Sequence, residues 1–194
     1  MDKDQPRAYI LAGGRSRRFG ADKARALVDG QPLLQRVAAT LAAAVGPVTV
    51  VAARHGEYED LGLRTIADNH PDRGPMGGLE AALADRGQGW VLLASCDFVC
   101  LRSHWIDRLV QSNCAAGAAA FHGERWEPLL GLYHTEILPL VRQRLAANQL
   151  AVKQLLDEAS ATPVPLPHDW PQLAHVNTRV DLAHAILEHV RRKD

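Results

Sequence analysis

The sequence predicts an α/β fold in which short strands alternate with helices. Apolar, β-branched runs such as 48–51 alternate with segments whose apolar residues recur at helical spacing. The run 90–94 is almost continuously apolar, which is typical of a strand buried on both faces in a parallel sheet. The chain of 194 residues has the usual size of one domain, and no repeat or composition shift divides it. One domain over 1–194 is therefore expected.

These patterns assign the elements in order along the chain. Strands are expected at 9–11, 48–51, 63–67, 90–94, 115–121 and 129–133. Helices are expected at 32–45, 78–83, 105–110, 137–145, 152–158 and 181–190. Gly46 and Pro47 break the chain between the first helix and the second strand. Four prolines within 163–171 predict an extended segment there rather than a helix.

Composition excludes several classes of function. Lys plus Arg and Asp plus Glu are equal, at 22 each, so no overall basic field attracts nucleic acid or an anionic membrane. The uncharged stretch 37–53 is split by a Gly-Pro break, so no piece of it is long enough to span a bilayer. The apolar run 8–14 is too short for a secretory signal, and three cysteines suit a reducing compartment. A cytoplasmic protein is expected.

The most informative segment follows the first expected strand and reads LAGGRSRRFGADK, from Leu11 to Lys23. Its glycines allow backbone N–H groups to surround phosphate oxygens, and its three arginines and one lysine add cationic donors. The segment therefore predicts a polyphosphate site. The Walker motif, the dinucleotide-binding glycine motif and the Tyr-x-x-x-Lys pair of short-chain reductases are each missing from the sequence.

The same segment resembles the signature L-x-G-G-x-S-x-R-M-G-x-D-K of the molybdenum cofactor guanylyltransferases, the MobA family. Further matches follow in the family's order over nearly the whole chain, at 29–34, 74–79, 95–97, 127–133 and 176–182. The resemblance implies a Rossmann-like nucleotidyltransferase fold, with a mostly parallel central sheet and helices on both faces. It also implies transfer of GMP from GTP to molybdopterin or its molybdenum-loaded form, with Mg²⁺ as the cofactor. Proteins that deliver or receive the cofactor are expected as further partners.

The resemblance also implies the residues of the site. It places Leu11, Ala12, Gly13 and Gly14 at the nucleotide, Arg18 and Lys23 at its phosphates, Asp68 at the nucleoside and Asn177 at the pterin. Lys23 and Asp97 form the expected catalytic pair, with Asp97 as the Mg²⁺ ligand. These roles suit the residue types, because Mg²⁺ prefers hard oxygen ligands and a cation offsets charge on the phosphates. From the sequence alone, two of these residues have another interpretation. Asp68 is also typical of a turn, and Asn177 is also typical of a helix N-cap.

Three positions depart from the family pattern and keep alternatives open. Val51 stands where the family often has Asn after the second strand, Val99 where it has Pro, and His175 where it has Asn. The alternatives are a nucleotidyltransferase with another base or acceptor, such as cytidylyl transfer to molybdopterin or transfer to a sugar phosphate, and a non-catalytic nucleotide-binding module. Guanine is favoured because related cytidylyltransferases carry Ala where this chain has Gly13, and the missing methyl leaves room for a purine.

Overall fold

The computed structural model describes residues 5–12, 19, 22–112, 117–170, 175, 176, 178 and 180–183. The strands of its main sheet are β1 (Arg7–Leu11), β4 (Val48–Ala52), β5 (Arg64–Ala67), β6 (Trp90–Ser95), β7 (Ala118–His122), β8 (Trp126–His134) and β9 (Thr162–Pro165). A separate hairpin consists of β2 (Leu27–Val28) and β3 (Gln31–Pro32). The helices are α1 (Leu33–Val45), α2 (Pro75–Arg86), α3 (Ser103–Val110), α4 (Leu138–Ala146) and α5 (Val152–Glu158), with 3-10 turns η1 (Lys23–Arg25), η2 (Glu59–Leu61) and η3 (Thr135–Ile137).

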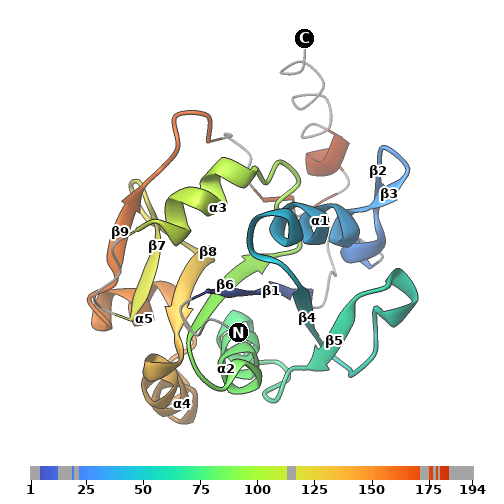
Figure 1. Cartoon of the computed structure of the whole chain (residues 1–194). Coiled ribbons are helices and arrows are strands. Elements are labelled where there is room, and N and C mark those ends of the chain that lie inside the picture. The colour runs from blue at the N-terminus through green and yellow to red at the C-terminus, as the bar shows by residue number, and fades with distance from the viewer. Residues whose placement is uncertain are drawn as a thin grey trace.

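The main sheet has the strand order β5-β4-β1-β6-β8-β7-β9 and is mostly parallel, which confirms the predicted fold class (Figure 1). β5, β4, β1 and β6 are parallel neighbours, β8 is antiparallel to both β6 and β7, and β9 is parallel to β7. The chain leaves β1 toward β4 on one side, whereas β6 joins β1 on the other. In open α/β sheets, ligands bind at the carboxyl ends of the strands where the strand order reverses in this way.

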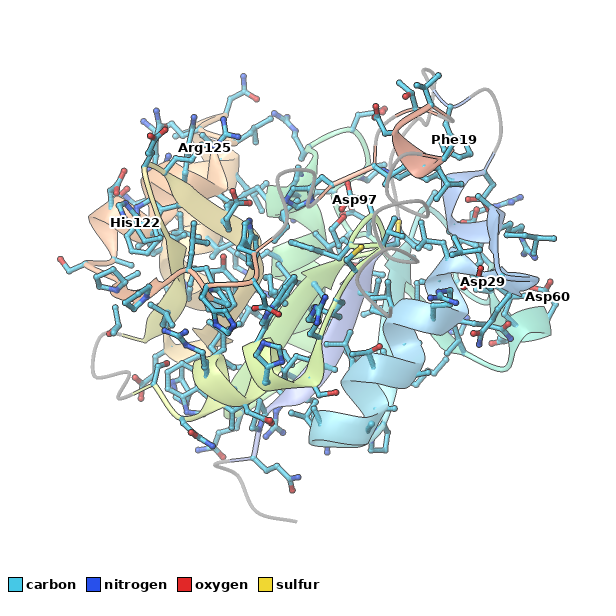
Figure 2. The ribbon with its side chains drawn as sticks, turned by 90° about the horizontal axis from the view of Figure 1, so that it is seen from above. Phe19, Asp29, Asp60, Asp97, His122 and Arg125 are labelled. Atoms are coloured by element: carbon cyan, nitrogen blue, oxygen red, sulfur yellow. The ribbon has the colours of Figure 1, made fainter. Side chains whose placement is uncertain are left out.

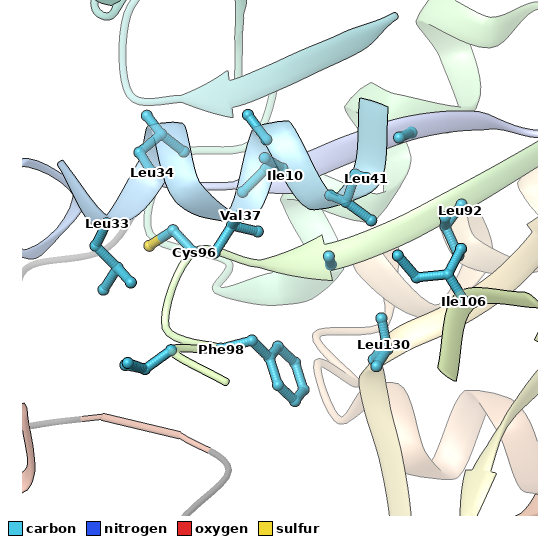
Figure 3. Close-up of a cluster of buried hydrophobic side chains, with 14 of the residues drawn as sticks. Ile10, Leu33, Leu34, Val37, Leu41, Leu92, Cys96, Phe98, Ile106 and Leu130 are labelled. Carbon is cyan, nitrogen blue, oxygen red and sulfur yellow. The ribbon is translucent and has the colours of Figure 1, made fainter. Parts of the chain in front are cut away.

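Helices cover both faces of the sheet (Figure 1). α1 packs with α3 on one face, and α2 packs with α4 on the other, where α5 also contacts β7 and β8. Side chains of β1 alternate between these layers: Ile10 joins the cluster under α1, whereas Tyr9 and Leu11 join the cluster under α2. Figure 3 shows the first cluster, in which Leu34, Val37 and Leu41 of α1 face the sheet. The two buried layers hold the carboxyl edge of the sheet in place.

Most predicted elements are present in the structure, with some differences in their bounds. The first helix ends where expected, because Gly46 takes φ 88°, a conformation that suits glycine. α2 begins at Pro75 rather than at 78, with its proline in the first turn. The proline-rich segment contributes β9 at the sheet edge, where a missing N–H is tolerated. The β2–β3 hairpin was not predicted, and of the helix expected at 181–190 only 181–183 lie among the described residues.

None of the described helices is both long enough and apolar enough to cross a membrane.

Candidate active site

The two expected catalytic residues lie together beyond the carboxyl end of β6, next to the end of β1. Ala12 N donates to Val51 O at 2.9 Å, and Cys96 N donates to Leu11 O at 3.1 Å, so the strand ends stay paired up to the last residue. Asp97 follows directly, and the Lys23 Nζ lies 3.2 Å from its Oδ2. The two residues are 74 positions apart in sequence. In Figure 2, Asp97 lies at the end of β6, between the β7–β8 hairpin and the β2–β3 hairpin.

The Asp97 carboxylate is held from both sides by donors. Lys23 contacts Oδ2, and His175 Nδ1 lies 3.0 Å from Oδ1, while only 12% of the side chain is exposed. Burial alone would raise the pKa of Asp97. The hydrogen bond and charge of His175, together with the charge of Lys23, outweigh burial and lower this pKa to about 2. Asp97 is therefore a carboxylate at neutral pH.

Lys23 is fixed by its backbone as well as by its ammonium group. It opens η1, whose N-cap Asp22 accepts from Ala24 N at 3.0 Å and from the Tyr58 hydroxyl at 3.1 Å. The Lys23 Nζ also donates to Val176 O at 3.1 Å. Only 14% of the side chain is exposed. Lys23 therefore lies over the carboxyl end of β6 and links it to residues 175–176.

His175 joins Asp97 to a second carboxylate, that of Glu127 at the start of β8. Its Nε2 lies 3.1 Å from Glu127 Oε2, and its ring centroid lies 4.3 Å from that of Phe98. Burial by itself would lower the pKa of the imidazole. The hydrogen bonds to Asp97 and Glu127 prevail and raise the pKa to about 9. In the sequence, His175 stands out only as a departure from the family pattern, and Glu127 was not predicted as a site residue.

Asp68 lies farther along the same edge, directly after β5. Its backbone N donates to Ala52 O at 2.8 Å, and its Oδ1 accepts from His70 N at 2.7 Å. Burial raises the pKa of this carboxyl group. Three strand spacings, about 14 Å in all, separate β5 from β6. Asp68 and Asp97 are therefore too far apart to contact the same atom.

The first turn of α2 packs closely against both ends of this site. A Cβ at Gly77 would lie 2.8 Å from Asp68 Oδ1, and a Cβ at Gly78 would lie 2.7 Å from Leu11 Cδ2. Glycine at both positions therefore lets the helix approach β1 and the loop after β5 at once. This contact ties Leu11, expected at the nucleotide, to the loop that carries Asp68.

Glu80 of α2 anchors the same loop and was not selected from the sequence. Its buried carboxylate accepts from Asn69 Nδ2 at 3.1 Å and from Arg142 Nε of α4 at 2.9 Å. His70 Nε2 lies 3.7 Å from Oε2. A glutamate in the middle of a helix is usually solvated, so nothing in its spacing distinguished it.

We expect Glu80→Ala to lower the free energy of unfolding by about 1–3 kcal/mol, because it leaves part-buried donors without an acceptor. Urea denaturation measures this change. Asp29→Asn is the control: it weakens the contact with Arg36 at 3.3 Å, in which the aspartate is half exposed, and should cost under about 1 kcal/mol. Equal small losses in both variants would contradict an anchoring role for Glu80.

Several expected site residues lie outside the described residues. These are Gly13, Gly14, Arg18 and Asn177.

Two of the three departures from the family pattern, Val51 and Val99, are buried residues. Val51 lies within β4 and is buried in the core rather than after the strand, so this position cannot offer a side chain to a ligand. Val99 is buried in the cluster under α1.

The Asp97 site suits Mg²⁺ held jointly with a phosphate ligand. Over the parts of the chain that the structure describes, no group of three or more His, Cys, Asp or Glu side chains could hold a metal ion. Mg²⁺, however, commonly takes one or two carboxylates and completes its shell with phosphate oxygens and water. Asp97 is ionised, and its oxygens retain lone pairs beyond those used by Lys23 and His175. The donor set therefore fits an ion carried by a polyphosphate.

The fold resembles that of a solved nucleotidyltransferase. A solved nucleotidyl transferase from Methanothermobacter superposes with a TM-score of 0.75 at 18% identity, covering 98% of this chain and 99% of that one. A family model described as the MobA-like NTP transferase domain matches residues 8–162. The chain belongs to this family.

Two relatives extend the comparison to named enzymes. A protein of Deinococcus radiodurans, described as a probable molybdenum cofactor guanylyltransferase, is 44% identical over 147 residues, which are 73% of this chain and 74% of the relative. The molybdenum cofactor guanylyltransferase of Serratia proteamaculans is 34% identical over 176 residues, 89% of each chain. These identities agree with the resemblance found in the sequence.

Proposed function

We propose that the protein transfers GMP from GTP to molybdopterin, or to its molybdenum-loaded form, and releases pyrophosphate. The observation that carries this proposal is the Lys23–Asp97 pair beyond the carboxyl end of β6, the parallel neighbour of β1. It supplies one cation and one anion where an α/β sheet binds its ligand. Membership of the MobA-like family and the names of both relatives support the same reaction.

The proposed reaction gives each expected site residue a role. Leu11 ends β1 and Ala12 follows it, and both would contact the nucleotide, whereas Asp68 would accept hydrogen bonds from the nucleoside. Lys23 would contact the phosphates, and Asp97 would hold Mg²⁺. Bound there, Mg²⁺ would neutralise phosphate charge and align the reacting groups. Gly13, Gly14 and Arg18 would complete the phosphate site, and Asn177 would contact the pterin.

The Lys23–Asp97 pair also explains how the site keeps its charges neutralised before substrate binds. Two partly buried opposite charges neutralise each other at 3.2 Å. A triphosphate with its cation offers each residue a partner of the required sign. Lys23 would then turn from Asp97 Oδ2 toward the phosphates, and Asp97 would keep an anionic oxygen for the ion. The site would remain electrically balanced in both states.

The reaction requires no general base from the protein. The acceptor is a phosphate monoester with a second pKa of about 6, so it arrives largely as a dianion at neutral pH. The protein then needs only to bring two anionic groups together, to orient them and to exclude water. We further propose that the enzyme acts in the cytoplasm, where one protein would deliver its acceptor and another would receive its product.

A transfer assay tests the proposal. Purified protein is incubated with Mg²⁺, GTP labelled at the α-phosphate and molybdopterin, and the products are the guanine dinucleotide form of the cofactor and pyrophosphate. Label transferred from CTP instead would make the protein a cytidylyltransferase. Label on a sugar phosphate would change the acceptor, and binding of GTP without any transfer would leave a nucleotide-binding module.

We expect GTP to bind at least about 10-fold more tightly than CTP, a difference of about 1.4 kcal/mol. Because glycine rather than alanine stands at Gly13, this segment would leave room for a purine. Guanine presents two adjacent N–H groups that can donate to a carboxylate such as Asp68. Calorimetry with both nucleotides and Mg²⁺ measures the ratio. A preference for CTP would contradict guanine recognition.

A further inference from the structure

The His175 ring occupies an unusual position between two carboxylates from different strands. Its Nδ1 lies 3.0 Å from Asp97 Oδ1 after β6, and its Nε2 lies 3.1 Å from Glu127 Oε2 on β8. Of the His175 side chain, 28% is exposed, against 16% for Glu127 and 12% for Asp97. All three side chains are thus mostly buried, and each keeps a small fraction of its surface exposed to solvent.

The ring is held in place by the protein itself. His175 and Phe98 form an isolated antiparallel bridge, and Val176 N donates to Asp97 O at 3.2 Å. The Phe98 ring, which is buried, lies 4.3 Å from the imidazole and 6.1 Å from Trp170. The imidazole therefore reaches Asp97 through backbone pairing and aromatic packing.

Glu127 is equally well placed to hold the far side of the ring. It pairs with Phe121 across β7 and β8, next to a shift in register between Ala120 and Phe121. The following residue is fixed because the Tyr133 hydroxyl donates to Pro128 O at 2.6 Å. Glu127 therefore meets His175 from a rigid strand rather than from a loop.

We infer that Glu127 and His175 form a positioning pair for Asp97. Two donors fix the carboxylate in the free protein, Lys23 on Oδ2 and His175 on Oδ1. Under the proposed function, on which this inference rests, Lys23 leaves Oδ2 for the phosphates. His175, held by Glu127, then remains as the donor that keeps the carboxylate plane in the orientation the ion requires. Neither His175 nor Glu127 has to touch the reacting atoms.

The test measures ion binding separately from transfer. Mn²⁺ is added as the probe to protein in molar excess over GTP, so that little free nucleotide chelates the ion, and free Mn²⁺ is followed by electron paramagnetic resonance. We expect Glu127→Gln and His175→Asn each to weaken Mn²⁺ binding about five- to tenfold. The double variant should be no weaker than the weaker single variant, because both changes break one linkage. Glu124→Gln, in the exposed tip of the same hairpin, is the matched control and should stay within twofold of wild type.

Steady-state kinetics add a second readout. If the pair positions Asp97, kcat should fall about tenfold or more in both variants while the KM for GTP changes by less than about threefold. Glu127→Gln keeps the shape of the side chain, so it still gives an answer if His175→Asn does not fold.

Two results would overturn the inference. The first is a lower melting temperature with Mn²⁺ affinity and kcat within twofold of wild type, which would make the pair a fold contact only. The second is additive losses in the double variant. Failure of the proposed function looks different: wild-type protein would transfer no GMP, yet the variants would still weaken Mn²⁺ binding.

Discussion

Asp97→Asn is expected to lower the rate of guanylyl transfer by at least about 1000-fold, equivalent to about 4 kcal/mol in the barrier. The substitution keeps the size of the side chain and removes its charge. An amide oxygen is a weaker ligand for Mg²⁺ than a carboxylate, and Lys23 and His175 lose the anion that both contact. Single-turnover transfer with labelled GTP measures the loss.

The same variant carries a prediction for stability. The pKa of Asp97 is lowered to about 2, below the value near 3.9 expected in the unfolded chain. The carboxylate therefore stabilises the fold above about pH 4, and that contribution is lost as the pH falls toward 2. We expect the variant to unfold cooperatively but at a lower temperature at pH 7, with a smaller difference from wild type at pH 3.

Asp107→Asn is the control for both measurements, because Asp107 is exposed on α3. It should leave both transfer and melting temperature near wild type. If folded Asp97→Asn protein kept transfer within tenfold of wild type, Asp97 would not be the ion ligand and the charge balance described for the site would fail.

Much of the sheet follows from patterns in the sequence. The apolar runs at β1, β4 and β6 are long enough, and rich enough in β-branched and aliphatic residues, to identify buried strands. The hairpin β2–β3 has only two residues in each strand, too few for an alternating pattern. The prolines of β9 suppressed a strand prediction because they cannot donate to a ladder, yet β9 needs donors on one side only.

The antiparallel pairing of β8 could not be predicted from its composition. Its neighbour β6 is buried on both faces, and that apolar run indicated parallel neighbours. In fact β6 pairs parallel with β1 and antiparallel with β8. Burial on both faces requires only that helices cover both sides of the sheet, and it does not fix the direction of the next strand.

The candidate site was predictable where a residue directly follows a strand. Asp97 lies after a buried run, so its place at the carboxyl edge follows from the α/β pattern. Glu127 and His175 gave no such signal. Their contact depends on the direction of β8 and on an isolated bridge at Phe98, neither of which leaves a periodic trace in the sequence.

Lys23→Ala is expected to weaken GTP binding about 10- to 100-fold, equivalent to about 1.4–2.8 kcal/mol. The physical reason is a specific contact: a cation with only 14% of its side chain exposed, lying beside the end of β6, gains more from phosphate oxygens than a solvated one does. Calorimetry with GTP and Mg²⁺ measures the change. Guanosine, which has no phosphates, should bind the variant and the wild type equally.

Arg25→Ala is the matched control, because Arg25 belongs to the same turn and carries the same charge. Its guanidinium is bound to Asp60 by contacts of 2.6 and 2.9 Å and is 40% exposed. If the basic segment acted only through its overall field, the two variants would lose similar affinity, and the losses would shrink together as salt is added. A different result is expected if Lys23 contacts the phosphates: only Lys23→Ala then loses affinity, and it does so for GTP but not for guanosine. A general field could not produce this difference, because the two residues carry the same charge and lie two positions apart.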